Sequence, residues 1–284
     1  MISGHRYITI PNNPSPVELV EISEPEYLNL LSDLRKVYEF MYYKRRIREI
    51  KMNIDAFFEA KRYYTEIYEK SYSKTIYFDY KEEAFVELNR CLINFISSFK
   101  SFVEHCESKI KKIFGDSSEQ SKEFKTLLSE LFDNNFSYRF LIKLRDYAVH
   151  IGYPIEYVSF VNYIFSPSNT DNWYEVQTLV SKDKLLSSGV FNARIKGEIE
   201  LEKDPFDISL YIFKVYRLIW QVFRKTIQMA TDEFIIPANR LIQLSQKYNQ
   251  DNLCITMPKI ELGRINFDSK NLPIQLAKEI SEIV

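Results

Sequence analysis

Glycine is scarce in this chain, and so is cysteine. The 284 residues include six glycines, which are scattered and form neither a G-x-G-x-x-G turn nor a phosphate-cradling loop. Dinucleotide-binding and nucleoside-triphosphate folds are therefore not expected. The three cysteines, Cys91, Cys106 and Cys254, have no metal-ligand spacing, and their odd number argues against a disulfide framework. We expect reduced, buried thiols, no metal and no other cofactor.

An excess of charge of one sign and long apolar runs are also missing. The 38 basic and 39 acidic residues give a net charge of −1, so no global field attracts nucleic acid and any such site has to be local. The apolar runs are too short to span a bilayer, and the N-terminus alternates polar and apolar residues instead of forming the apolar core of a signal peptide. The sequence predicts a soluble, cytoplasmic protein with no membrane partner.

Apolar residues at helical spacing occupy most of the chain. From Tyr80 to Phe114 they recur at steps of three and four, which is typical of a bundle helix. Residues 26–70 lack glycine and proline and predict one long helix or two abutting helices. Two shorter helices follow, and the second ends near Gly152 and Pro154. The sequence therefore predicts a mainly α fold with a small β-hairpin or strand extension.

The pattern divides the chain into four segments. They are an N-terminal strand and connector (1–25), a helical bundle (26–155), a β-rich hairpin segment (156–204) and C-terminal helices that pack on the bundle with a mixed tail (205–284). The strand is expected at Tyr7 to Ile10, before a connector that is rich in proline. The hairpin pairs Tyr157 to Phe165 with Trp173 to Val180, and residues 166–172 form its turn.

One hexapeptide, Arg145-Asp146-Tyr147-Ala148-Val149-His150, stands out as a candidate site. An arginine holds a phosphate by two parallel hydrogen bonds, and histidine side chains move protons near neutral pH. Arg145, Asp146 and His150 lie off the apolar line of their helix, and Asp146 and His150, four residues apart, share a face. This combination suggests phosphodiester chemistry without a metal.

The R-x4-H string at the end of a helical bundle resembles the HEPN superfamily over about residues 26–155. Arg145 and His150 match the defining residues of its motif, and Asp146 stands where the superfamily commonly carries a polar residue. The resemblance implies a HEPN-like bundle and a metal-independent endoribonuclease, with two motifs facing each other across a homodimer. It also implies a toxin–antitoxin or phage-defence setting, with an antitoxin or another regulatory protein as partner.

The residue types fit RNA cleavage because RNA carries its own nucleophile, the 2′-hydroxyl. His150 is then the general acid or base, Arg145 clamps the phosphate, and Asp146 orients the imidazole or holds Arg145. On an ideal helix Arg145 and His150 lie about 140° apart. They line one cleft only if the helix end unwinds or a second subunit faces them.

Other polar residues are weaker candidates for contacting RNA. Asn94, Ser98, Ser101 and His105 share one face of the long helix and are candidate substrate-binding residues beside Arg145, although small polar residues also permit close helix packing. A basic cluster guides RNA or forms a solvated helix face; it comprises Lys44, Arg45, Arg46, Arg48 and Lys51. The alternatives to an enzyme are a non-catalytic helical RNA-binding or protein-interaction module, or a structural partner subunit.

Overall fold

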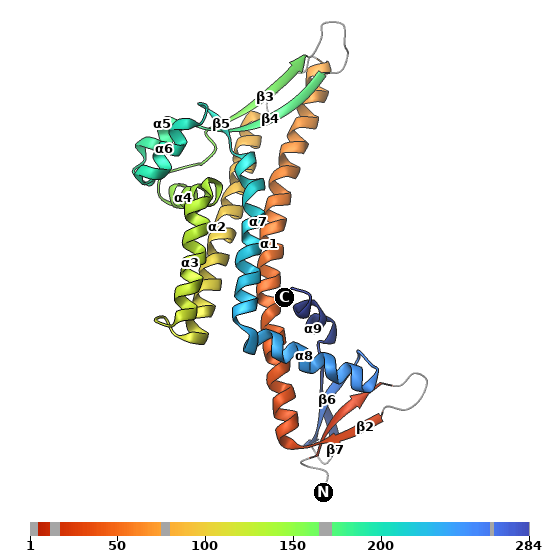
Figure 1. Ribbon diagram of the computed structural model, residues 1–284. Helices are drawn as coiled ribbons and strands as arrows, with labels where there is room; N and C mark the ends of the chain where they lie inside the picture. Colours follow the sequence, from red (N-terminus) through yellow and green to blue (C-terminus); the bar gives the residue numbers. More distant parts are fainter. Residues whose placement is uncertain (1–4, 12–17, 75–79, 165–171, 262–263, 284) are drawn as a thin grey trace. The chain divides into compact units, whose positions relative to one another are not determined.

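The computed structural model describes residues 5–11, 18–74, 80–164, 172–261 and 264–283 (Figure 1). The described chain is mainly helical with small antiparallel sheets, which confirms the mainly α prediction. It forms two compact units: the first comprises Met1–Arg45 and Phe223–Val284, and the second comprises Arg46–Val222. Helix α1 (Glu24–Lys74) and helix α7 (Ser209–Met229) each contribute residues to both units.

The first unit contains a four-stranded antiparallel sheet in the order β2-β1-β6-β7. Its strands are β1 (Arg6–Ile10), β2 (Glu18–Ile22), β6 (Cys254–Glu261) and β7 (Arg264–Asn271). The strand predicted at Tyr7 to Ile10 is confirmed as part of β1. The connector expected in 11–25 contains a strand as well, and two of its four prolines, Pro14 and Pro16, lie outside the described residues.

Helices α8 (Thr231–Tyr248) and α9 (Ile274–Ser281) complete the first unit with the start of α1. Asp33 of α1 is 1% exposed, and its carboxylate accepts a hydrogen bond of 2.8 Å from Nε of Arg240. Phe40 packs against Phe234 at 6.4 Å between ring centroids. Helix α8 begins six residues before Pro237 and buries this proline in its interior.

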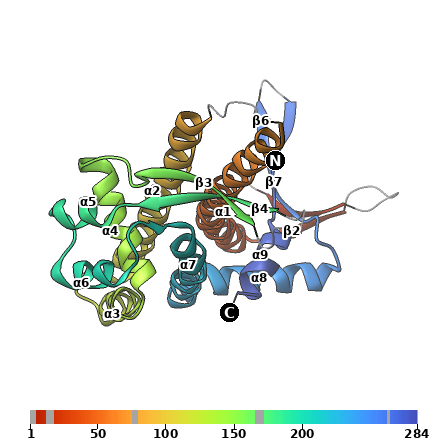
Figure 2. The ribbon, with the colours of Figure 1, turned by 90° about the horizontal axis from the view of Figure 1, so that it is seen from above.

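The second unit is built around helix α2 (Lys81–Phe114), which packs on α3 (Glu119–Asn134) and α4 (Phe136–His150) (Figure 2). The apolar stripe predicted for α2 is its buried face, and Leu92, Phe95 and Phe99 are fully buried. Acidic residues in its first turn and lysines in its last turn complement the helix dipole. Gly115 then ends the helix with φ of +92°, a left-handed value that favours glycine.

A three-stranded antiparallel sheet in the order β3-β4-β5 lies in the second unit. It consists of β3 (Tyr157–Ile164), β4 (Asn172–Val180) and β5 (Phe206–Asp207), so the predicted hairpin is confirmed. Its turn, apart from residue 172, lies outside the described residues. The segment predicted as β-rich also holds two short helices, α5 (Lys182–Ser187) and α6 (Ala193–Leu201).

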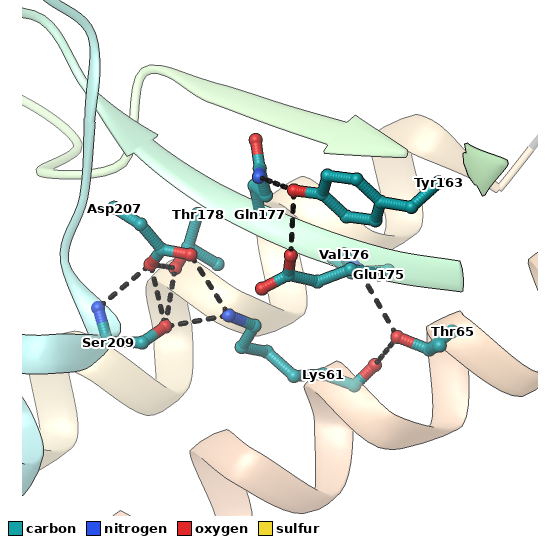
Figure 3. Close-up of polar contacts among 9 residues, drawn as sticks. All are labelled: Lys61, Thr65, Tyr163, Glu175, Val176, Gln177, Thr178, Asp207 and Ser209. Atoms are coloured by element: carbon teal, nitrogen blue, oxygen red, sulfur yellow. Dashed lines mark hydrogen bonds and ion pairs between the residues drawn. The ribbon is translucent and has the colours of Figure 1, made fainter. Parts of the chain in front are cut away.

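A polar cluster joins this sheet to α1 and α7 (Figure 3). The ammonium group of Lys61 lies 3.1 Å from Oδ2 of Asp207 and donates a hydrogen bond of 2.7 Å to the hydroxyl of Ser209. The other carboxylate oxygen of Asp207 accepts hydrogen bonds from the hydroxyl of Thr178 at 2.7 Å and from the backbone amide of Ser209 at 2.9 Å. Because Ser209 is the first residue of α7, the cluster also fixes where that helix begins.

The compact units do not follow the four sequence segments. The first unit joins both ends of the described chain because β1 pairs with β6, with Tyr7 opposite Thr256. The second unit takes most of 26–155, all of the hairpin segment and most of α7. In the part of the chain that the structure describes, none of the helices combines the length and apolar character that a membrane crossing requires.

Candidate functional site

Helix α4 presents the candidate motif at its C-terminal end. Its apolar stripe turns inward, with Phe140 and Leu144 fully buried and Tyr147 4% exposed. The backbone amides of Ile151 and Gly152 both donate to the carbonyl of Tyr147, at 2.9 and 3.3 Å, which closes the last turn. His150 is therefore the last residue of the helix, as the Gly152 and Pro154 stop signals predicted.

The three motif residues lie off the buried face. Arg145 is 36% exposed and Asp146 21% exposed at the side chain, and His150 is exposed. Within the described ranges the imidazole of His150 has no hydrogen-bond or ion-pair partner in its own chain. A ring in this position is open to a substrate or to a second protein surface.

Asp146 is surrounded by cations. Its carboxylate accepts a hydrogen bond of 2.7 Å from the ammonium of Lys100 on α2, lies 3.4 Å from Nζ of Lys143 and 3.6 Å from a guanidinium nitrogen of Arg145. Burial acts to raise the pKa of Asp146, but the hydrogen bond and charge of Lys100, with help from Lys143, outweigh it and lower that pKa. Asp146 is therefore an anion near neutral pH.

Three cations around one carboxylate leave a local surplus of positive charge. This charge stands next to the helix end that carries His150, in a protein whose net charge is −1. Of the two roles predicted for Asp146, the contact with Arg145 is present in the structure at 3.6 Å. Asp146 and His150 share a helix face by their spacing, but no hydrogen bond joins them among the described residues.

Two of the four predicted substrate-binding residues of α2, Ser98 and Ser101, have their side chains in contact with α1, whereas Asn94 is exposed. Ser98 accepts a hydrogen bond of 3.0 Å from the side-chain amide of Asn53, which also donates to the backbone carbonyl of Asn94 at 3.4 Å. Ser101 accepts a hydrogen bond of 2.7 Å from a guanidinium nitrogen of Arg46. These contacts fit the alternative in which small polar residues on α2 permit close helix packing. His105, one turn further along, is exposed.

The residue of α2 that reaches the motif is Lys100, which the sequence analysis did not select. Lys143 was also missed, although its position three residues before Asp146 is a signal that a search for side-chain pairs on α4 finds. For Lys100 the chain offers no such local signal. Only the packing of α2 against α4 brings its ammonium group to Asp146, 46 residues away in sequence.

The basic cluster at the middle of α1 is largely neutralised. Lys44 pairs with Glu279, Arg46 pairs with Glu49 at 2.6 Å, and Lys51 pairs with Asp55. Arg45 and Arg48 remain exposed. Because ion pairing reduces the charge available to an anionic ligand, most of this cluster's positive charge is compensated within the chain.

Exposed apolar side chains flank His150. Val149 is 52% exposed, Ile151 54% and Tyr153 53%, although all three are close in sequence to a buried helix face. The ring of Tyr153 packs edge-on against Phe85 of α2, with 5.4 Å between centroids, so its position is fixed. Large apolar side chains that gather beside a polar site are typical of a surface that another molecule covers.

Metal ligands do not gather at this site. In the described ranges, no group of three or more histidine, cysteine, aspartate or glutamate side chains is arranged to hold a metal ion. All three cysteines are free thiols; Cys91 and Cys106 are buried as predicted, whereas Cys254 is only half-buried. Burial raises the pKa of Cys91 to about 11, which keeps that thiol protonated and unreactive.

A helical bundle hosts many activities, so the fold alone does not assign a function to this chain. The resemblance to the HEPN superfamily rests on Arg145, His150 and the helices before them. A comparison of the chain with protein-family models, with curated proteins and with solved structures gave no match.

Proposed function

We propose that the protein is a metal-independent endoribonuclease of the HEPN type that acts as a homodimer and cleaves RNA at Arg145 and His150. The observation that supports this most directly is an exposed, unpartnered histidine at the end of α4, beside three cations that share one carboxylate. Histidine supplies proton transfer and the cations supply phosphate binding, which together are what RNA cleavage by its own 2′-hydroxyl requires.

In the proposed reaction the 2′-oxygen attacks the neighbouring phosphorus while a base removes its proton. The bond from phosphorus to the 5′-oxygen breaks, that oxygen receives a proton, and the products carry a 2′,3′-cyclic phosphate and a 5′-hydroxyl. His150 transfers one of these protons, and Arg145 compensates the charge that develops on the phosphate oxygens. Lys100 adds a second cation to the same patch.

In a homodimer, a second copy of the chain supplies the motif side chain that one copy cannot bring to the same phosphate. Arg145 and His150 point about 140° apart on a regular helix, and α4 is helical up to His150, so one copy does not bring both side chains to the same phosphate. The exposed side chains of Val149, Ile151 and Tyr153 give a second copy an apolar surface to bury. Two motifs then provide an acid and a base on opposite sides of one phosphate.

The second candidate function is RNA binding without cleavage. The positive surplus around Asp146 favours it too, because a phosphate clamp requires the cations and not the histidine. The proposed cellular setting is the cytoplasm, in a toxin–antitoxin or phage-defence system, and its support is the resemblance of the Arg145–His150 string.

The test is cleavage of an unstructured RNA by the purified full chain in the presence of EDTA. His150→Ala and Arg145→Ala are expected to lower the rate by about a hundredfold or more, as the loss of an acid–base group or a charge stabiliser does. Matched controls are His5→Ala, at a histidine paired with Glu21, and Arg90→Ala, at an arginine paired with Glu87.

The outcomes separate the readings. Cleavage that persists equally in both motif variants contradicts the ribonuclease proposal, because the activity then comes from elsewhere. RNA binding without cleavage is supported if the wild type binds RNA but does not cleave it. In that case His150→Ala should bind RNA as tightly as the wild type, and Arg145→Ala should bind it more weakly. An inactive wild type that binds no RNA and copurifies with another protein supports a structural partner subunit.

A further inference from the structure

A groove runs between helices α1 and α2, in a part of the second unit that the ribonuclease proposal does not use. It consists of two adjoining cavities of about 370 and 460 Å³, which share the side chains of Tyr64 and Glu87. Other lining residues recur one helical turn apart, as Ala56 and Ala60 do on α1. Because side chains at this spacing share one face of a helix, the groove follows the direction of α1.

The apolar part of the groove is open to solvent. Tyr63 on α1 is 58% exposed and Val86 on α2 is 47% exposed, whereas Tyr64, which lines both cavities, is 7% exposed and forms the floor. The small side chains of Ala56 and Ala60 let another helix approach α1 closely. Large apolar side chains that remain exposed on both walls of a groove are typical of a surface that another molecule covers.

The charge of the groove has one sign. Among the described residues that line it, four are glutamates and none is a lysine, arginine or histidine. Glu59, Glu82 and Glu83 are exposed and form no ion pair within the described part of the chain. The fourth, Glu87, pairs with an arginine of α2 at 2.6 Å. Burial, together with the charges of Glu83 and Glu87, raises the pKa of Tyr64, so the negative potential extends to the floor of the groove.

From the exposed apolar walls and the single sign of charge, we infer that the groove docks a basic amphipathic helix of a partner protein. The apolar face of that helix covers Tyr63 and Val86, and lysine or arginine side chains along its flanks pair with the carboxylates of the groove. Residues 56–64 of α1 span about 12 Å, so about two turns of the docked helix contact them. The same carboxylates repel an RNA strand, which makes this surface distinct in chemistry from the cations around Asp146.

Fluorescence anisotropy of a labelled model peptide, titrated with the purified full chain, tests this inference. The probe is a helix of about 18 residues that carries leucine on one face and lysine on the other. One control peptide has the same residues in an order without an apolar face, and a second has glutamate in place of lysine. The amphipathic lysine peptide is expected to bind with a Kd of about 100 µM or tighter, and both controls at least about tenfold more weakly. Weaker binding of the probe, or equal binding of the two lysine peptides, overturns the inference.

Glu83→Gln locates the docking site. The substitution removes one carboxylate of the groove and is expected to weaken binding of the lysine peptide by about three- to tenfold. The matched control is Glu26→Gln, because Glu26 is also an exposed acidic residue without an ion pair in the first turn of a helix, but it does not line the groove. This control should bind the peptide as the wild type does. An equal loss in both variants means that binding follows the total charge and overturns the site.

Tyr63→Ser tests the apolar contact. Because the ring is 58% exposed, we expect the melting temperature of the protein without peptide to stay nearly unchanged, while peptide affinity falls by about tenfold. Tyr157→Ser on β3, at a residue that is 53% exposed, is the matched control and should bind as the wild type does. Unchanged peptide affinity in Tyr63→Ser, or an equal loss in both variants, overturns the assignment of this surface.

Two results assign the groove to another occupant and also overturn the inference. Self-association of the wild type that is lost in Glu83→Gln assigns it to a second copy of the chain, and displacement of the bound peptide by single-stranded RNA assigns it to a nucleic acid. The inference goes beyond the ribonuclease proposal and does not rest on it. None of the peptide measurements involves RNA cleavage, so the two proposals fail or succeed separately.

Discussion

Breaking the ion pair between Lys61 and Asp207 is the change whose effect on stability follows most directly from the structure. Asp207→Asn keeps the oxygen that accepts from Thr178 and Ser209 but places an amide group opposite the ammonium of Lys61, 3.1 Å away in the wild type. The side chains of Lys61 and Asp207 are 13% and 21% exposed, so solvent compensates the lysine only in part. We therefore expect the substitution to destabilise the second unit.

The magnitude follows from the contacts that are lost. A hydrogen bond between charged groups contributes about 1.5–3 kcal/mol, and breaking a fully buried pair costs about 3–5 kcal/mol. Because both side chains are partly exposed and Lys61 keeps Ser209, the lower part of these ranges applies, and Asp207→Asn should cost about 2–3 kcal/mol. For a unit of this size that lowers the melting temperature by about 5–10 °C.

The assay is thermal unfolding followed by circular dichroism, with Asp55→Asn as the matched control. Asp55 pairs with Lys51 on the same helix as Lys61, but their side chains are 46% and 57% exposed, so its loss should leave the melting temperature nearly unchanged. Lys61→Met and the double variant complete a thermodynamic cycle, in which we expect a coupling of about 1–2 kcal/mol. Equal melting temperatures for Asp207→Asn and Asp55→Asn would refute the reasoning.

The same pair predicts a pH dependence. Burial acts to raise the pKa of Asp207, but the charge of Lys61 and the hydrogen bonds from Ser209 and Thr178 lower it overall. A carboxylate whose pKa is lower in the folded protein stabilises the fold above its unfolded pKa, and this contribution is lost as the pH falls through the folded value. The gap in melting temperature between wild type and Asp207→Asn should therefore shrink as the pH falls from 6 toward about 3.

Three further changes probe the rest of the second unit. Lys100→Met should reduce RNA cleavage or RNA affinity by about tenfold, measured with the same unstructured RNA, since it removes a cation that contacts Asp146 at 2.7 Å. Ile151→Asp should weaken self-association by at least about tenfold in sedimentation experiments, because it brings like charges together across a symmetric interface. Leu201→Asp on α6, at a residue that is 87% exposed, should have no effect on self-association. Arg139→Met should lower the free energy of unfolding by about 3 kcal/mol or more. The side chain of Arg139 is 4% exposed, and its guanidinium contacts Glu198 at 2.6 Å and the carbonyl of Phe132 at 2.8 Å. An unchanged free energy of unfolding would show that these contacts are dispensable.

Local periodicity predicted the helices well. The step pattern of α2 identified its buried face, and the Gly152 and Pro154 signals located the end of α4 at His150. These features depend on residues within a few turns of one another, which a sequence displays directly. Pro237 shows the limit of such local signals, because a proline normally interrupts a helix, whereas here it lies buried inside α8.

The candidate site was predictable only in part. The string from Arg145 to His150 and its exposure could be inferred because one helix carries all of it. Lys100, and likewise the pairing of Lys61 with Asp207, depend on contacts between elements that are distant in sequence. The sequence predicts that Ser98 and Ser101 share one face of α2 beside Arg145, but it did not reveal that Asn53 and Arg46 of α1 contact them there.

The pairing of β1 with β6 has a consequence for synthesis of the protein. The hydroxyls of Thr9 and Thr256 meet at 2.7 Å across this pair, although 247 positions separate them. At about 5–20 residues per second, a ribosome completes the second strand roughly 10–50 s after the first. The second unit is contiguous from Arg46 to Val222 and can fold during that interval. The nascent chain therefore carries β1 with one edge unpaired until β6 has been synthesised, and a chaperone that shields this edge would act in that interval.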